Sequence, residues 1–272
     1  MEATGERFLP EKMQGEIKSE HLNRYYFVKN LIDISDKIVL DIASGEGYGS
    51  NLLAQSAKYV YGVDISEEAV NFAKVKYTAE NLSFIKGSAF KIPLEDNSID
   101  VVVSFETIEH HDKHDEMLKE INRVLKMNGI LVLSSPNKSE YSDKTNFQNP
   151  YHVKELYTNE LVDLVSKYFI SVELYWQRYL KGSVILPIGN EININKIKEA
   201  TDIIDSMYDV VVATNEPSLK KNSQIVLCFD QEDEVKKNYY DEYSSVLNSF
   251  AFKLGAFVLK PFYWIKSKLS VL

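Results

Sequence analysis

The chain has 272 residues, of which 44% are hydrophobic and 26% charged, and this composition is that of a globular protein of one or two domains. Its 11 glycines and 7 prolines are too few for a collagen-like or largely disordered chain. The net charge of −9 counts against nucleic acid as the principal partner. One cysteine, no long apolar run and no secretory leader together predict a cytoplasmic protein without disulfides or a spanning helix.

Residues 37–135 alternate short β-branched runs with longer amphipathic stretches, a pattern typical of βαβ units around a parallel sheet. We expect strands at Ile38–Ile42, Tyr59–Val63, Leu82–Ile85, Val101–Phe105 and Ile130–Ser134. We expect helices at Ser50–Ala57, Ser66–Tyr77 and Asp115–Leu125, the first residue of the second being its N-cap and Met127–Gly129 closing the third.

The pattern loosens after residue 135. A helix is expected to follow Thr158 as its N-cap, and strands are expected at Ile170–Trp176 and Gln224–Phe229. Between those strands, residues 181–222 read as an insertion with one helix near Ile192–Met207, and an insertion of that length usually forms a lid or a binding element.

The last stretch, Phe250–Leu272, has four lysines, no acidic residue and many aromatic side chains. Such a tail fits a helix lying in a membrane interface, which would place the protein peripherally at the inner face of a membrane. The same side chains could instead pack on the domain, on a second copy of the chain or on a glycan-assembly enzyme. We therefore divide the chain into a domain over 1–230, with an N-terminal helical cap over 1–36, and a helical tail over 231–272.

The strongest local motif is DIASGEGYG at Asp41–Gly49, a strand that runs into a glycine-rich turn opening a helix. Gly45, Gly47 and Gly49 let the backbone approach a ligand, and the helix N-terminus presents N–H groups to it. The spacing differs from the GxGxxG of dinucleotide-binding turns, so a dehydrogenase is disfavoured. Asp41 suits a cationic group of the ligand better than a pyrophosphate.

Asp64 ends the second expected strand, twenty-three residues after Asp41. An acidic residue there can accept hydrogen bonds from a ribose diol. The two acids and three glycines together predict a nucleoside-sized crevice at the carboxyl ends of adjacent strands. The simpler reading is a tight turn with capped strand ends.

At this point the sequence resembles the class I S-adenosylmethionine-dependent methyltransferases. The resemblance rests on four motifs in order: DIASGEGYG, YGVDIS at Tyr61–Ser66, GSAFKIPLEDNSIDVVVSFETIEH at Gly87–His110 and LKEINRVLKMNGILVLSSPN at Leu118–Asn137. It implies a Rossmann-like, doubly wound, seven-stranded, mainly parallel α/β sheet whose last strand is parallel or antiparallel. The helical insertion and the C-terminal helical extension would decorate that sheet.

The resemblance also implies which residues bind the cofactor. The three glycines would surround the methionine moiety, Asp64 the ribose, and Ser88 with Ala89 the adenine, while Glu106 would end the fourth strand beside the cofactor. The complete predicted set for S-adenosylmethionine, and for its product S-adenosylhomocysteine, is Arg24, Tyr25, Asp41, Ala43, Gly45, Gly47, Gly49, Asp64, Ile65, Ser88, Ala89 and Glu106.

The N-terminal sequence, TGERFLPE followed by GEIKSEHLNRYYF, is similar to the leader of methyltransferases of bacterial cell-surface polysaccharide pathways. In this interpretation Arg24 pairs with the cofactor carboxylate, and Tyr25 and Tyr26 exclude water from the site. The alternative is an ordinary surface helix with a solvated arginine.

Three histidines are candidates for catalysis, because methyl transfer to a hydroxyl requires a base. His110 and His111 follow the fourth strand, and His152 precedes the helix at Thr158, so all three are expected at the ligand edge of the sheet. A helix cap or a packed ring is the simpler interpretation of each. His114 is expected to be exposed.

A metal site could be assembled from His110, His111, Asp112 and His152, but these residues form no tight ligand motif, and we predict none. Trp176, Gln177 and Arg178 are expected at the same edge as contacts of the acceptor substrate, together with Tyr26. The alternative places Trp176 in the core and Arg178 in solvent.

We thus expect O-methylation of a sugar, or of a small decoration such as a phosphoramidate on a nucleotide carrier, in the assembly of a bacterial surface polysaccharide. A methyltransferase for a small metabolite outside glycan assembly is one alternative. The other is a non-catalytic scaffold that keeps the cofactor crevice. The oligomeric state is left open, a homo-oligomer being compatible with the sequence.

Overall fold

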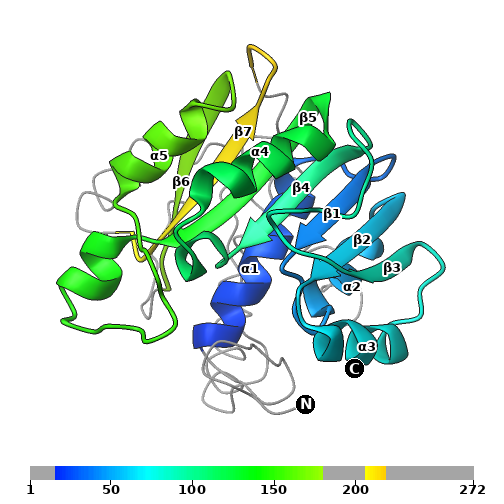
Figure 1. Ribbon diagram of the computed structural model, residues 1–272, viewed down its shortest axis with the longest axis horizontal. Helices are drawn as coiled ribbons and strands as arrows, with labels where there is room; N and C mark the ends of the chain where they lie inside the picture. The colour runs from blue at the N-terminus through cyan, green and yellow to red at the C-terminus, as the bar shows by residue number, and fades with distance from the viewer. Residues whose placement is uncertain (1–15, 180–205, 219–272) are drawn as a thin grey trace, which may run out of the picture. The chain divides into compact units, whose positions relative to one another are not determined.

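A seven-stranded sheet forms the middle layer of the part of the chain that the computed structural model describes, residues 16–179 and 206–218 (Figure 1). Its order is β3-β2-β1-β4-β5-β7-β6. The strands are β1 (Ile38–Ile42), β2 (Tyr59–Asp64), β3 (Leu82–Lys86), β4 (Ile99–Phe105), β5 (Leu125–Pro136), β6 (Ser171–Gln177) and β7 (Tyr208–Thr214). β7 is antiparallel to both of its neighbours and the other pairs are parallel. The predicted doubly wound, mainly parallel fold is confirmed.

Helices cover both faces of the sheet. They are α1 (Glu16–Leu31), α2 (Tyr48–Ala54), α3 (Glu67–Lys76), α4 (His114–Val124) and α5 (Thr158–Ser166), with a 3₁₀ turn η1 (Ile108–His110) and a π turn η2 (Ser139–Asp143). Apolar side chains of α1, α2 and α3 pack in one core cluster, and those of α4 and α5 pack in another on the opposite face.

The central strand β4 is apolar on both sides because both of its faces are buried. In β4, Val101 and Val103 belong to the cluster of α1, α2 and α3, whereas Val102 between them belongs to the cluster of α4 and α5. Alternate side chains of a strand point to opposite faces, so a continuous valine run serves two cores. Each fully buried side chain of this kind contributes about 1.5–3 kcal/mol.

Helix ends follow the expected capping chemistry in one case and depart from it in two. The Ser66 hydroxyl accepts the Ala69 N–H at 3.3 Å and caps α3 as predicted. Tyr157, not Thr158, is the N-cap of α5, and its N–H is bound by Glu160 at 3.0 Å. Residues 127–129 do not close α4, because that helix ends at Val124 and the chain enters β5 directly.

The strand that pairs with β5 corrects the expected layout of residues 181–222. Tyr208–Thr214, inside the predicted insertion, pairs with Pro136–Ile130 on one side and with β6 on the other. Its four central residues, Val210–Ala213, are apolar because they lie between the two cores. The strand expected at Gln224–Phe229 and nearly all of the helix near Ile192–Met207 lie outside the described residues.

The chain divides into two compact units. The first comprises Met1–Arg178 and Ser206–Cys228, and it contains the sheet. The second comprises Tyr179–Asp205 and Phe229–Leu272, which apart from its first residue lie outside the described residues, as does the predicted amphipathic tail. Among the helices of residues 16–179 and 206–218, none has both the length and the apolarity needed to cross a bilayer.

The order of the strands fixes where a ligand should bind. From β1 the chain adds β2 and β3 on one side and then returns to place β4 on the other. Such a switch point opens a crevice at the carboxyl ends of the two central strands. Helix α1 crosses beneath the ends of β1 and β4 (Figure 1), and a Tyr25–Asp41 hydrogen bond joins it to β1. The residues at this edge are therefore the candidates for function.

Candidate functional site

The glycine-rich turn after β1 follows a backbone path that favours glycine. Gly45 has φ +55° and Gly47 has φ +89°, and the preceding Ala43 also has a positive φ of 61°. A Cβ added to Gly45 would meet nothing within 4 Å, so open space adjoins this residue. The strained loop therefore presents its backbone to space that a ligand can fill.

Gly49 has a different reason to be glycine. A Cβ at this position would lie 1.9 Å from Cζ of Tyr25. The tyrosine ring is buried there, edge-on to Tyr48 and Phe105 at centroid distances of 5.4 and 5.0 Å. Tyr25 therefore closes the floor of the turn, and the glycine makes room for it.

Asp41 is a buried carboxyl group under the turn. It accepts a hydrogen bond from the Ser50 hydroxyl at 2.7 Å and a longer one from Tyr25 at 3.4 Å. Burial raises the pKa of Asp41 to about 7, and the hydrogen bonds from Ser50 and Tyr25 lower it only in part. The group is thus poised to gain or lose a proton near neutrality.

Asp64, at the end of β2, is held by the turn that it faces. Its two oxygens accept the N–H groups of Gly45 and Ser66, each at 2.8 Å. The carboxylate is only partly buried, and each oxygen has a second lone pair with which it can accept a ligand hydroxyl. Ile65 beside it is 71% exposed, an apolar surface at the position predicted for a cofactor contact.

Arg24 brings a buried positive charge to the same edge. Its Nε donates to Oε1 of Gln177 at 2.8 Å, its Nη2 lies 3.4 Å from Glu106, and its guanidinium stacks over Tyr208 at 4.5 Å. Its Nη1 is buried and has no hydrogen-bond partner among the described residues. A buried donor without a partner is costly, so this atom is suited to an anionic group of a ligand.

Glu106 is the residue at which β4 turns away from the sheet. It adopts a positive φ of 49°, and its carboxylate accepts the Ser134 hydroxyl at 2.6 Å. Ser134 lies on β5, so this bond ties the two strand ends together. The carboxylate next to Arg24 lies where a cofactor contact was predicted.

Ser88 and Ala89 lie in the loop after β3. The Ser88 hydroxyl accepts the Phe90 N–H at 3.2 Å, and Ala89 packs against the core cluster of α4 and α5. The first residue thus shapes the loop that follows β3. Whether the pair contacts an adenine ring stays a prediction.

The three candidate histidines separate into two groups. The rings of His110 and His152 meet edge to face at 5.2 Å, and Glu109 lies with them. His111 instead points to the sulfur of Met117 at 3.2 Å and packs on Phe90. Burial, with lesser effects of His114 and His110, lowers the pKa of His111 to about 4. His111 therefore lies apart from the other two.

His114 is buried, contrary to the expectation that it is exposed. Its Nε2 lies 2.8 Å from the carbonyl oxygen of His111. The ring thus fastens the start of α4 to the turn before it.

The residues expected to contact the acceptor differ in how far they are exposed. Trp176 is 61% exposed and so is not in the core, and Tyr26 is 37% exposed. Arg178 lies 3.7 Å from Glu140. Gln177 is buried, and its amide nitrogen donates to the Glu20 carbonyl while its oxygen accepts from Arg24. Gln177 is therefore a positioning residue for the arginine.

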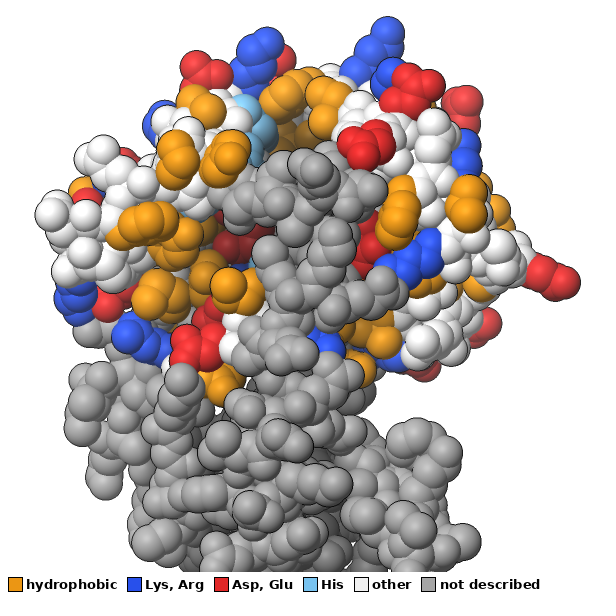
Figure 2. All heavy atoms as spheres, turned by 90° about the horizontal axis from the view of Figure 1, so that it is seen from below, with side chains coloured by type: hydrophobic (Ala, Val, Ile, Leu, Met, Phe, Trp, Pro, Cys, Tyr) orange, Lys and Arg blue, Asp and Glu red, His pale blue; other side chains and the backbone are white. Residues whose placement is uncertain are grey.

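Two residues at this edge escaped sequence reasoning. Tyr208, under the Arg24 guanidinium, lies on the strand that was taken for an insertion. Glu109 directly precedes His110 at the end of the third motif, and that adjacency was the signal available. Acidic side chains and a histidine come to the surface on this side of the molecule among hydrophobic ones (Figure 2).

Residues 40–133 match the family described as the methyltransferase domain. A protein of Mycobacterium tuberculosis, named as a probable S-adenosylmethionine-dependent methyltransferase, is 33% identical over 165 residues, which are 60% of this chain and 58% of that protein. The phthiotriol/phenolphthiotriol dimycocerosates methyltransferase of the same species is 29% identical over 124 residues, 44% of this chain and 46% of that one. The chain thus spans about half the length of these curated relatives.

Among solved structures, the fold resembles the candidate methyltransferase in the complex with the Haloferax volcanii Trm112 methyltransferase activator. The TM-score is 0.59 at 18% identity, and the match covers 75% of this chain and 92% of that chain. At this identity the likeness concerns the fold alone.

Proposed function

We propose that this protein is a methyltransferase that uses S-adenosylmethionine. The observation that carries the proposal is that the 94 residues from 40 to 133 that match the methyltransferase domain are those that build the switch point of the sheet. They contain the glycine-rich turn, Asp64 and Glu106. When bound, S-adenosylmethionine supplies an electrophilic methyl group on a sulfonium, which an acceptor nucleophile displaces.

The side chains at the edge fit the polar groups of that cofactor. Asp64 can accept hydrogen bonds from the ribose hydroxyls, and the buried Nη1 of Arg24 can donate to the carboxylate. Asp41, when ionised, can balance the charge of the amino group. The open space beside Gly45 leaves room for the methionine moiety against the backbone.

The acceptor is proposed to be a hydroxyl oxygen that approaches from the side of His110 and His152. The leader around Arg24 supports a sugar, or a small decoration such as a phosphoramidate, in the assembly of a bacterial surface polysaccharide. The similarity to a phthiotriol/phenolphthiotriol dimycocerosates methyltransferase favours a second candidate, a lipid hydroxyl. Assays with a panel of nucleotide-linked sugars and of hydroxylated lipids would separate the two.

The location is proposed to be the cytoplasm, with the tail over 231–272 resting on the inner face of a membrane. The lysines and aromatic side chains of Phe250–Leu272 support this proposal. Full-length protein should sediment with anionic liposomes, and a chain ending before Phe250 should not. Equal sedimentation of the two proteins would contradict membrane binding by the tail.

Binding of the cofactor is the test of the proposed function. Calorimetric titration with S-adenosylmethionine and S-adenosylhomocysteine should give micromolar affinity for the wild type, and Asp64→Asn should lower it at least about tenfold, since bonds to a charged group are lost. Asp33→Asn is a matched control, because Asp33 also accepts a backbone N–H, that of Ser35 at 3.1 Å, but on an exposed turn. No binding by the wild type would overturn the proposal.

A further inference from the structure

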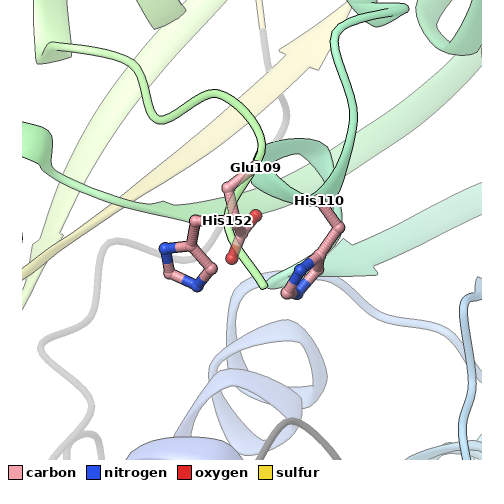
Figure 3. Close-up of side chains that lie close together, drawn as sticks. All are labelled: Glu109, His110 and His152. Atoms are coloured by element: carbon pink, nitrogen blue, oxygen red, sulfur yellow. The ribbon is translucent and has the colours of Figure 1, made fainter. Parts of the chain in front are cut away.

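Three side chains beyond the end of β4 lie close enough to share one ion. They are Glu109 and His110 of η1 and His152 of the loop before α5, and they form what we call the Glu-His-His cluster. One ligand atom from each residue lies within 4.8 Å of the other two. Figure 3 shows the Glu109 carboxylate between the two imidazole rings. We propose that this cluster binds a divalent cation and that the cation holds the hydroxyl oxygen of the methyl acceptor.

The hydrogen bonds of both rings favour the tautomer that a metal needs. Nδ1 of His110 lies 3.1 Å from the carbonyl oxygen of Tyr151, so it carries the proton and donates it. Nδ1 of His152 lies 2.6 Å from Glu155 and donates in the same way. In each ring the lone pair is then on Nε2. Ligating histidines commonly donate their other N–H to a carbonyl or a carboxylate in this manner.

The two segments that carry the ligands are fixed to each other by backbone bonds. The carbonyl oxygen of Glu109 accepts the N–H groups of Val153 and Lys154 at 2.8 and 3.0 Å. Glu109 itself is only 1% exposed. The cluster is therefore assembled before any ion arrives, which lowers the entropic cost of binding.

At His152, a hydrogen bond would be exchanged when the cation binds. The Asn149 amide nitrogen lies 3.0 Å from Nε2 of His152 and donates to it. The ion would replace this hydrogen bond, and the amide could turn toward solvent or toward a bound oxygen. The exchange involves a single loop side chain and leaves the ring in its orientation, because Glu155 and the stacked ring of Tyr141, at 5.3 Å, hold it.

The donor set indicates which kind of ion fits. Two imidazoles and one carboxylate suit divalent transition metals such as Mn²⁺, Co²⁺ or Zn²⁺, and three protein ligands leave coordination positions open. A metal lowers the pKa of a bound oxygen and orients it. This inference rests on the proposed function. It deepens that function, because it assigns the binding of the acceptor's hydroxyl oxygen to the cation. His110 and His152 would then be metal ligands instead of the general base.

The test uses full-length protein freed of metal with a chelator, in the absence of cofactor. It is titrated with Mn²⁺, followed by electron paramagnetic resonance and calorimetry, and separately with Zn²⁺, followed by calorimetry. We expect one Mn²⁺ per chain. His152→Gln and Glu109→Gln should weaken binding at least about tenfold, and Glu155→Gln should weaken it by about 10–100-fold through the orientation of the ring. His21→Gln, on α1 and outside the cluster, is the matched control and should bind as the wild type does.

Two results would overturn the cation site. One is the absence of Mn²⁺ and Zn²⁺ binding to the wild type, and the other is binding that His152→Gln, His110→Gln and Glu109→Gln leave unchanged. Circular dichroism of each variant identifies one that has not folded. The single changes at His110 and His152, two residues that are less buried than Glu109, keep the test decisive if Glu109 tolerates no substitution.

A parallel titration with S-adenosylmethionine separates this inference from the proposed function. Cofactor binding without metal binding would overturn the cation site and leave the methyltransferase in place. Metal binding that the cluster variants abolish, without cofactor binding, would support the site and overturn the proposed methyl transfer.

Discussion

The turn after β1 and the Glu-His-His cluster lie at the same edge of the sheet but are built in opposite ways. The turn is made of backbone at positive φ, with the N–H of Gly45 bound to Asp64. The cluster is made of side chains, brought together by bonds between Glu109 and Val153, forty-four residues apart. The first region is suited to a fixed cofactor and the second to an ion and a variable acceptor. Because the turn depends on backbone conformation and the cluster on side chains from distant segments, a change in the sequence can alter one of the two without the other.

The largest expected effect concerns Asp41, under the turn. Its folded pKa of about 7 lies above the usual value of 3.8, so between these values the folded state binds more protons than the unfolded one. The free energy of unfolding should therefore fall as pH rises from 4 to 7, with this group contributing a slope of up to about 1.4 kcal/mol per pH unit.

Asp41→Asn removes this titration while its side-chain oxygen can still accept from Ser50. Urea unfolding at several pH values should show the wild type losing stability relative to the variant as pH rises. A constant difference between the two proteins from pH 4 to 7 would mean that Asp41 titrates normally.

The next effect concerns the packing of α1 against the turn. Gly49→Ala places a methyl group into the Tyr25 ring, and such overpacking costs about 1–3 kcal/mol of unfolding free energy. Tyr25→Ala should relieve part of that cost, so the double variant should be more stable than the sum of the single changes implies. Strict additivity in denaturant unfolding would show that the two residues do not meet.

Arg24, on α1, offers a test of the proposed cofactor site that does not change the Glu-His-His cluster. Arg24→Lys keeps the charge but loses the planar fork, and we expect about tenfold weaker binding of S-adenosylmethionine. A decarboxylated analogue of the cofactor should bind to both proteins alike. If the analogue discriminates between them as the intact cofactor does, Arg24 does not contact the carboxylate. Mn²⁺ binding should not change.

The smallest expected effect belongs to Trp176, because 61% of its surface is exposed. Trp176→Ala should change the free energy of unfolding by no more than about 0.5 kcal/mol and leave cofactor affinity unaltered. If the ring contacts the acceptor, KM for that substrate should rise in steady-state assays. A large loss of stability would place the ring in a core after all.

The regions differ also in how far the sequence revealed them. The turn with Asp41 and Gly45 could be predicted because it is continuous in sequence and its glycines suit the local backbone geometry, and the place of Asp64 beside it followed from the parallel pairing of β1 with β2. The sheet up to β5 was predicted for a similar reason, since each strand is a short apolar run bounded by turn residues.

The features that the sequence did not reveal depend on contacts between residues that are distant in the chain. β7 resembles an isolated apolar run until its antiparallel pairing with β5 is known. The hydrogen bond between Gln177 and Arg24 joins residues 153 positions apart in the chain, and no local pattern predicts it. Glu109 was overlooked because only the return of the loop at residues 149–154 brings His152 beside it. No periodicity in the sequence encodes these encounters.

The most direct test of the account is a diffraction experiment on crystals grown with S-adenosylhomocysteine and Mn²⁺, with data collected at the manganese absorption edge. We expect the nucleoside at the carboxyl ends of β1 and β2, its ribose on Asp64. We expect an anomalous peak at about 2.0–2.3 Å from the ligand atoms of Glu109, His110 and His152. A map with neither the nucleoside at the turn nor the peak in the cluster would contradict the account.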